Sequence, residues 1–182
     1  MLSYRHSFHA GNFADVIKHV VAVKVLQSLG KKDKPFEYID THAGAGLYNL
    51  HSDHAQKLME YKSGIGKLQR SDFPELESYF EAIEAHQPEG WSGDLSELKT
   101  YPGSPMIASH FLRPQDRAWL YELHPQDHKS LCKNMEGNKK IRVSCEDGLN
   151  GITALLPPTS RRGLVLIDPS YEVKSEYDQV FD

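Results

Sequence analysis

A short apolar run that ends in an acid, a proline and an aromatic ring constrains the fold of this chain more than any other stretch. Leu164–Ile167 follow Gly163 without a polar interruption, and Asp168-Pro169-Ser170-Tyr171 comes directly after them. Such a brief run, rich in branched aliphatic residues, is typical of a strand buried on both faces, as in a parallel sheet. In open α/β sheets, ligands bind beyond the carboxyl ends of such strands. We therefore expect the chemistry of this protein at Asp168.

The chain has 182 residues, enough for one compact domain with a hydrophobic core, which we expect to span residues 1–182. No stretch is typical of a signal peptide or a membrane span, and two cysteines are too few for a disulfide framework. These features favour a cytoplasmic protein with reduced thiols and no membrane partner. The net charge is -4, so a nucleic-acid partner would need a local basic patch.

The ten histidines include two His-x-x-His pairs, at His6 and His9 and at His51 and His54. Neither pair is completed by a cysteine pair or a carboxylate-histidine cluster, so we expect no metal.

Hydrophobic runs and helix signals alternate along the chain in the order expected of a parallel α/β sheet. The strands are predicted at residues 36–40, 117–122, 141–145 and 164–167. The helices are predicted at residues 13–29, 52–67, 74–86, 105–112, 125–135 and 149–156. No second strand follows the first one at the usual spacing, so we expect an inserted helical subdomain at about residues 48–98.

The helix predicted over residues 13–29 has two candidate faces, and the spacing of its aliphatic residues decides between them. The predicted inward face consists of Phe13, Val16, Ile17, Val20, Val21 and Val25. A second face carries Asp15, Lys18, His19 and Ala22 at helical spacing. From spacing alone, Lys18 and His19 are predicted to lie on the solvated side of this helix.

The predicted first strand ends at Asp40 and is followed by Thr-His-Ala-Gly44-Ala-Gly46. Glycines at these positions permit positive φ angles and let the backbone approach a ligand, which favours a loop for a nucleotide-type cofactor. The loop lacks the third glycine of the dinucleotide fingerprint and the Lys-Ser/Thr of a P-loop. NAD and ATP are therefore disfavoured, and other nucleoside cofactors remain.

Each predicted strand finishes with an acid, and the four are Asp40, Glu122, Asp147 and Asp168. The carboxyl ends of parallel strands share one sheet edge, so these carboxylates are expected to lie near one another. Because like charges in one cleft repel, their grouping indicates a ligand with hydrogen-bond donors or positive charge.

These acids, with Asp40-x-x-x-Gly44-x-Gly46, resemble the ordered motifs of S-adenosylmethionine-dependent methyltransferases. Asp168-Pro169-Ser170-Tyr171 is similar to the Asp/Asn-Pro-Pro-Tyr/Phe signature of enzymes that methylate exocyclic amines of nucleobases. The N-terminal Met-Leu-Ser-Tyr-Arg-His-Ser-Phe-His-Ala-Gly-Asn, with Tyr-Pro-Gly-Ser-Pro, Glu-Leu-His-Pro and Ser-Arg-Arg-Gly-Leu, narrows the likeness. Over its whole length the chain resembles RlmJ-type 23S ribosomal RNA adenine-N6 methyltransferases. The resemblance implies a Rossmann-like methyltransferase fold, mostly a parallel sheet with helices on both faces, and an inserted helical subdomain.

The resemblance also implies roles for residues that bind the cofactor S-adenosylmethionine. Glu122 is expected to accept the two ribose hydroxyls, and Asp147, with the Gly148 backbone beside it, the amino group of the adenine. His42 is expected to contact the cofactor from the glycine-rich loop. Lys18, His19 and Ser104 are expected to hold the methionine end, whose carboxylate needs cationic or hydroxyl donors. Spacing alone gives Ser104 only the role of a helix cap.

At the substrate end, the resemblance implies that Asp168 is catalytic and also contacts the cofactor. With the Pro169 carbonyl, Asp168 would accept hydrogen bonds from adenine N6, raise the nucleophilicity of that nitrogen and take its proton. Tyr171 would stack on the extruded base, and Tyr4 would close over the RNA. The expected partner is 23S rRNA free of ribosomal proteins; the oligomeric state is not predicted.

Two departures from the pattern carry expectations of their own. Ser170 stands where enzymes of this type have a second proline. Serine makes the loop less stiff than proline would, and we expect this to lower activity. The sequence ends at Asp182, before the C-terminal strands of such enzymes, so we expect a fragment or a chain that needs a partner. Two alternatives stay open: a DNA adenine-N6 methyltransferase, and a catalytically silent protein that binds the cofactor or nucleic acid.

Overall fold

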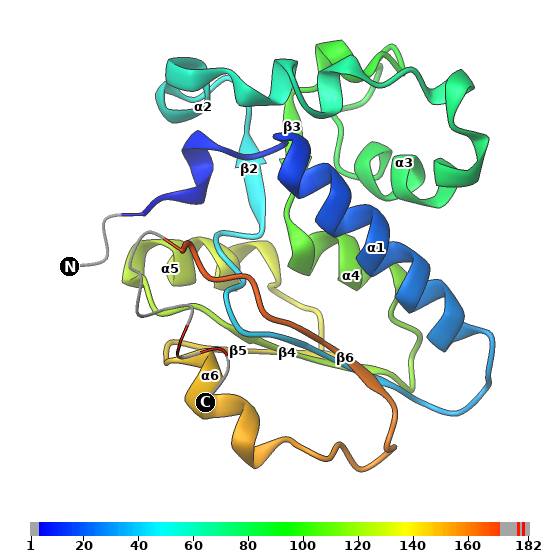
Figure 1. Ribbon diagram of the computed structural model, residues 1–182, viewed down its shortest axis with the longest axis vertical. Coiled ribbons are helices and arrows are strands. Elements are labelled where there is room, and N and C mark those ends of the chain that lie inside the picture. Colours follow the sequence, from blue (N-terminus) through cyan, green and yellow to red (C-terminus); the bar gives the residue numbers. More distant parts are fainter. Residues whose placement is uncertain (1–3, 172–177, 179, 181–182) are drawn as a thin grey trace. The chain divides into compact units, whose positions relative to one another are not determined.

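The computed structural model describes residues 4–171, 178 and 180, and the chain divides into two compact units (Figure 1). The first unit comprises Met1–Tyr4, Ser28–Ala45 and Leu112–Asp182, and the second comprises Arg5–Gln27 and Gly46–Phe111. Among the described residues, no helix is both long enough and apolar enough to cross a membrane.

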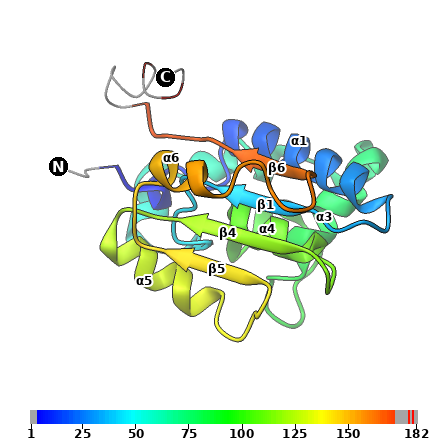
Figure 2. The same ribbon diagram turned by 90° about the horizontal axis from the view of Figure 1, so that it is seen from below.

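The first unit is built on four parallel strands in the order β5-β4-β1-β6, which Figure 2 shows side by side. The strands are β1 (Glu37–Asp40), β4 (Arg117–Tyr121), β5 (Ile141–Ser144) and β6 (Gly163–Leu166). Asp40 pairs in register with Leu120 of β4 and Leu166 of β6. All four predicted strands of the Rossmann-like methyltransferase fold are thus confirmed, and their carboxyl ends meet at one edge.

Helices α5 (Pro125–Asn134) and α6 (Gly148–Gly151) cover opposite faces of this sheet (Figure 1, Figure 2). A 3-10 turn, η7 (Ile152–Ala154), continues α6. Helix α5 begins at Pro125, where the missing N–H of proline is tolerated, and the His124 side chain accepts a hydrogen bond from the Asp127 backbone. Fully buried apolar side chains of β1, β4 and α5 form the core, among them Tyr38, Ile39, Leu120 and Leu131.

Strand β6 differs from its prediction, because its side chains are not buried on both faces. Leu164, Val165 and Leu166 are all partly exposed, and within the described residues β6 pairs with β1 alone. A groove of about 410 Å³ borders the strand and is lined by Leu156, Leu164 and Val165 among others. Because β6 is the last strand in the order β5-β4-β1-β6, its side chains are partly exposed, which its apolar sequence does not predict.

The second unit combines most of α1 (Phe13–Gly30) with short helices and a small antiparallel sheet. Its other helices are α2 (Asp53–Leu58), α3 (Glu77–Glu84) and α4 (Ser104–Phe111), and its strands are β2 (Leu47–Asn49) and β3 (Thr100–Pro102). Its 3-10 turns are η1 (His6–Phe8), η2 (Glu60–Lys62), η3 (Ile65–Lys67), η4 (Arg70–Asp72), η5 (Pro74–Leu76) and η6 (Leu95–Glu97).

The helix predicted over residues 52–67 is wrong in its length, because the chain there forms α2 and two separate 3-10 turns. The break occurs at Met59, whose φ of 51° lies in the left-handed region and ends α2. The strands β2 and β3 were not predicted, since each has three residues and β3 ends in a proline.

The predicted inward face of α1 is also wrong. Phe13, Ile17 and Val21 are exposed, whereas the buried residues are Asp15, His19, Ala22, Val23 and Leu26. The Asp15 carboxylate and His19 Nδ1 have hydrogen-bond partners inside the second unit, which compensate the removal of these groups from water, whereas the buried His19 Nε2 has none among the residues that the structure describes. Aliphatic spacing therefore does not identify the face that packs.

Candidate cofactor and substrate site

Three predicted site residues of the first unit follow neighbouring strands at one level of the sheet. Asp40 of β1 is in register with Leu120 of β4 and Leu166 of β6. Two residues beyond these three positions the chain has His42, Glu122 and Asp168, respectively. The parallel sheet thus brings the ends of β6, β1 and β4, with these three residues, to a common edge. Clustering of polar groups there is typical of ligand sites in open α/β sheets.

The glycine-rich loop after β1 is tied to both neighbouring strands. The Thr41 N–H donates to the Leu166 carbonyl at 3.1 Å, and the Ala43 N–H donates to the Tyr121 carbonyl at 2.8 Å. Gly44 and Gly46 have φ angles of 63° and 82°, which residues with a side chain rarely adopt. The prediction that these glycines permit positive φ angles is confirmed.

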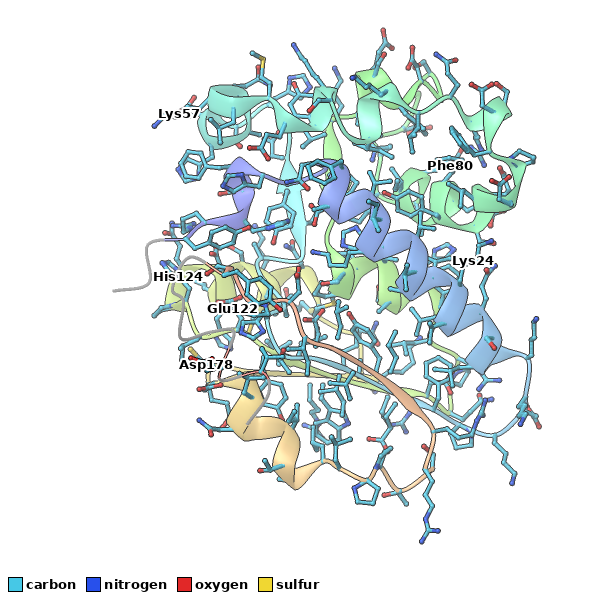
Figure 3. All side chains as sticks on the ribbon, in the orientation of Figure 1. Lys24, Lys57, Phe80, Glu122, His124 and Asp178 are labelled. Atoms are coloured by element: carbon cyan, nitrogen blue, oxygen red, sulfur yellow. The ribbon has the colours of Figure 1, made fainter. Side chains whose placement is uncertain are left out.

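Glu122 lies directly beyond β4 and accepts backbone hydrogen bonds with both carboxylate oxygens. Oε2 accepts from the Gly44 N–H at 2.8 Å, and Oε1 accepts from the His124 N–H at 2.7 Å. Figure 3 shows Glu122 and His124 next to each other. Burial raises the pKa of Glu122, and these two hydrogen bonds oppose the rise. A carboxylate has about four acceptor positions, so two remain for a ligand with two neighbouring hydroxyls.

Asp40 serves the loop instead of a ligand. Its side chain is fully buried, Oδ2 accepts from the Tyr38 hydroxyl at 2.7 Å, and Oδ1 accepts from the His42 N–H at 3.2 Å. The expectation that four acids face one ligand is therefore wrong for Asp40, because its carboxylate stabilises the turn that leads into the glycines.

Asp147 and Gly148 begin α6. The Asp147 carboxylate caps this helix, with Oδ1 accepting from the Leu149 N–H at 2.9 Å and Oδ2 from the Asn150 side chain at 3.1 Å. Gly148 is buried, and a Cβ atom there would lie 2.3 Å from the Thr41 carbonyl oxygen. The start of α6 therefore packs directly on the backbone that opens the glycine-rich loop, and the exposed Asp147 lies beside that contact.

The motif that follows β6 combines a partly buried acid with a buried proline and an exposed ring. Asp168 is partly buried, Pro169 is buried, and Tyr171 is 39% exposed. Tyr171 has a φ of 54°, a left-handed conformation that is uncommon for an aromatic residue and is enriched at functional sites. Tyr4, also predicted to contact the substrate, is partly exposed and belongs to the same unit.

The remaining predicted cofactor ligands, Lys18, His19 and Ser104, belong to the second unit. Lys18 Nζ lies 2.8 Å from Asp15 Oδ1, so the prediction of a solvated lysine from spacing alone is wrong. His19 is buried, with Nδ1 2.8 Å from the Tyr101 hydroxyl. Burial lowers the pKa of His19 to about 3, which keeps the ring neutral. Ser104 is buried at the start of α4, two residues after Pro102 of β3.

Sequence reasoning gave no role to Asp15 or Tyr101, which hold two of these ligands. The signal for Asp15 was its spacing of three residues from Lys18, which places both on one helix face. Tyr101 is part of the Tyr-Pro-Gly-Ser-Pro motif, but no spacing rule connects it with His19, 82 residues away.

Three histidines of the two His-x-x-His pairs have partners other than a metal. His6 and His9 contact the carboxylates of Asp15 and Glu60 at 2.8 Å and 3.0 Å, and His54 contacts the Ser7 hydroxyl at 2.8 Å. Over residues 4–171, 178 and 180, no three His, Cys, Asp or Glu side chains are grouped in a way that could hold a metal ion.

Known proteins resemble this chain over almost all of its length. The family described as "Ribosomal RNA large subunit methyltransferase D, RlmJ" matches residues 33–182. Two relatives named "Ribosomal RNA large subunit methyltransferase J", from Escherichia coli and Haemophilus influenzae, are each 50% identical over 182 residues. A crystal structure of protein LPL1258 from Legionella pneumophila, described under family DUF519, superposes with a TM-score of 0.81 at 42% identity.

These matches are longer proteins. The alignments cover 99% of this chain but 63% of each of the two methyltransferases, and 94% of this chain but 62% of the Legionella protein. The family match covers well over half of the 182 residues and includes the whole parallel sheet with its carboxyl edge. The chain therefore belongs to the RlmJ family of ribosomal RNA large subunit methyltransferases.

Proposed function

We propose that this protein transfers a methyl group from S-adenosylmethionine to the exocyclic N6 of an adenosine in 23S ribosomal RNA. The observation that carries the proposal is Glu122, whose carboxylate is fixed by two backbone N–H groups and keeps acceptor positions for a ribose diol. It stands at the same level of the sheet as Asp168, the acid of the motif similar to those of amine methyltransferases. The names of the two relatives support a ribosomal RNA substrate.

The donor groups of the first unit fit such a cofactor. Glu122 would accept both ribose hydroxyls, and Asp147 keeps acceptor capacity for an adenine amino group beside its helix-capping hydrogen bonds. Gly148, next to Asp147, packs so closely on the Thr41 backbone that it has no room for a side chain. His42 would contact the cofactor from the loop, and Lys18, His19 and Ser104 would hold its amino-acid end. When bound, S-adenosylmethionine supplies an electrophilic methyl group on a sulfonium.

Asp168 acts on the nucleophile. The N6 lone pair of adenine is delocalised into the ring, so a carboxylate that accepts an N6–H hydrogen bond returns electron density to nitrogen. With the Pro169 carbonyl it would orient the amine, and Asp168 then receives the proton that N6 gives up. Tyr171, which is partly exposed, would stack on the extruded base, and Tyr4 would contact the RNA.

The proposal is tested by incubating the protein with methyl-labelled S-adenosylmethionine and either protein-free 23S rRNA or duplex DNA, followed by nucleoside mass spectrometry. We expect N6-methyladenosine in the rRNA and none in the DNA, and Asp168→Ala should abolish transfer while S-adenosylmethionine still binds. The matched control is Asp33→Ala, which removes an exposed carboxylate of the same unit and should transfer normally. Label in DNA would select a DNA methyltransferase. Cofactor binding without transfer to either polymer would select a silent protein.

A further inference from the structure

A single buried carboxylate, Asp15, collects donors from two segments of the second unit. Its Oδ2 accepts from His6 Nε2 at 2.8 Å and from the Gly11 N–H at 2.9 Å, and its Oδ1 lies 2.8 Å from Lys18 Nζ. His6 and Gly11 belong to the N-terminal segment, whereas Lys18 is one turn further along α1. The Asp15 side chain is 1% exposed, so these contacts form away from water.

The charges of this cluster favour an ionised carboxylate. Burial alone would raise the pKa of Asp15, but the contact with His6 and the ammonium of Lys18 hold it well below its ordinary value. An ionised buried carboxylate forms stronger hydrogen bonds than a neutral one, and its geometry is set by its donors. Asp15 therefore restrains both the ammonium of Lys18 and the ring of His6.

Other side-chain contacts of the N-terminal segment involve partly exposed residues. His9 and Asn12 both contact the carboxylate of Glu60 at 3.0 Å, and Ser7 contacts His54 at 2.8 Å. His9 and Glu60 are each one-third exposed, so their ion pair is screened. Asp15 is thus a buried restraint that ties the segment to the helix carrying Lys18.

We propose that Asp15 is a positioning residue for methyl transfer. It would hold Lys18 where the ammonium can meet the carboxylate of the cofactor's amino-acid end, and would fix the N-terminal segment to the same point. This inference rests on the proposed function, because it takes Lys18 to be a ligand of S-adenosylmethionine. Asp15 itself touches neither cofactor nor RNA in this account.

Simple charge neutralisation makes the opposite prediction. If Asp15 only offset the charge of Lys18, its removal would leave a stronger cation and tighten the binding of an anionic group. If Asp15 positions Lys18, its removal frees a long side chain with many rotamers and weakens binding. The direction of the change in cofactor affinity therefore decides between the two roles.

The test compares Asp15→Asn, Lys18→Met and the double variant by calorimetric titration with S-adenosylmethionine and by steady-state methylation of 23S rRNA. We expect Asp15→Asn to raise the Kd and the KM for the cofactor about tenfold, the value of one charge-assisted hydrogen bond, with kcat at saturating cofactor little changed. The double variant should bind the cofactor no more weakly than Lys18→Met, because Asp15 acts through Lys18. Tighter binding by Asp15→Asn, or additive losses in the double variant, would overturn the proposal.

A matched control separates positioning from stability. Asp116 is equally buried, pairs with Arg113 at 2.8 Å three residues away and accepts the Phe36 N–H, but it precedes β4, at the end of that strand opposite to Glu122. Asp116→Asn should lower the melting temperature as Asp15→Asn does and leave cofactor affinity unchanged. Equal loss of affinity in both variants would show that Asp15 acts only through stability. If the parent protein bound no S-adenosylmethionine, the proposed function would fail, whereas normal binding by parent and Asp15→Asn alike would refute the positioning role alone.

Discussion

Replacing Glu122 by Gln tests the cofactor site at its best-defined group. The substitution keeps the shape of the side chain but turns one acceptor oxygen into an NH2 group, which has no acceptor position. Each oxygen now accepts one backbone N–H, at 2.8 Å from Gly44 and 2.7 Å from His124, so one of these contacts is lost in either amide orientation. One proposed ribose contact is lost with it.

The expected magnitude follows from that count. A hydrogen bond to a charged group contributes about 1.5–3 kcal/mol, so loss of one ribose contact should weaken cofactor binding about 10- to 150-fold. Loss of the backbone contact lowers the free energy of unfolding, while removal of a buried charge offsets part of that loss.

Calorimetric titration with S-adenosylhomocysteine measures the affinity, and urea unfolding measures the stability in parallel. The matched control is Glu136→Gln, which changes an exposed carboxylate of the same unit and should bind like the parent. If Glu122→Gln binds the cofactor with an affinity within about threefold of the parent's, the loss is smaller than the expected minimum of about tenfold. That result would refute the assignment of the ribose to this carboxylate.

Four further predictions concern the same sheet edge. Because burial raises the pKa of Glu122 above 4.5, cofactor affinity should fall as the pH is lowered toward that raised value, and calorimetry of Glu122→Gln should show no such slope. The raised pKa also means that protonated Glu122 adds to the free energy of unfolding. This contribution is fully present below pH 4.5 and is lost as the pH rises through the folded pKa, and urea unfolding at a series of pH values would measure it. Gly148→Ala should destabilise the protein by about 1–3 kcal/mol in thermal unfolding, since its Cβ would lie 2.3 Å from the Thr41 carbonyl oxygen; an unchanged melting temperature would contradict that contact. Asp168→Asn should lose methyl transfer while keeping its Kd for S-adenosylhomocysteine within about threefold, and retained transfer would remove Asp168 from the proton path.

The sequence predicted the parallel sheet well because its strands are short apolar runs that end in acids. The same pattern placed Glu122 and Asp168 at one edge, and register confirms that they follow β4 and β6 at one level. The glycine-rich loop was predictable because positive φ angles at Gly44 and Gly46 leave few alternatives to glycine.

The parts that sequence reasoning missed depend on pairing between distant groups. His6 and Lys18 pair with the buried Asp15 carboxylate, and Tyr101 pairs with Nδ1 of the buried His19, so a polar face of α1 packs while an apolar one is exposed. Spacing along a single helix does not contain that information.

The acids themselves show a second reason for the misses. Asp40 accepts the Tyr38 hydroxyl, and Asp147 caps α6, so an acid after a strand can stabilise a turn or a helix as readily as it can bind a ligand. The sequence does not show which acids keep free acceptor positions for a ligand, because that depends on the hydrogen bonds that each carboxylate forms in the folded protein.

A crystal structure of the protein with S-adenosylhomocysteine tests the central claim most directly. We predict that both ribose hydroxyls lie within hydrogen-bond distance of the two Glu122 oxygens, that the adenine amino group contacts Asp147, and that the sulfur lies toward Asp168. A ligand bound elsewhere, or a ribose that leaves the Glu122 carboxylate untouched, would contradict the account.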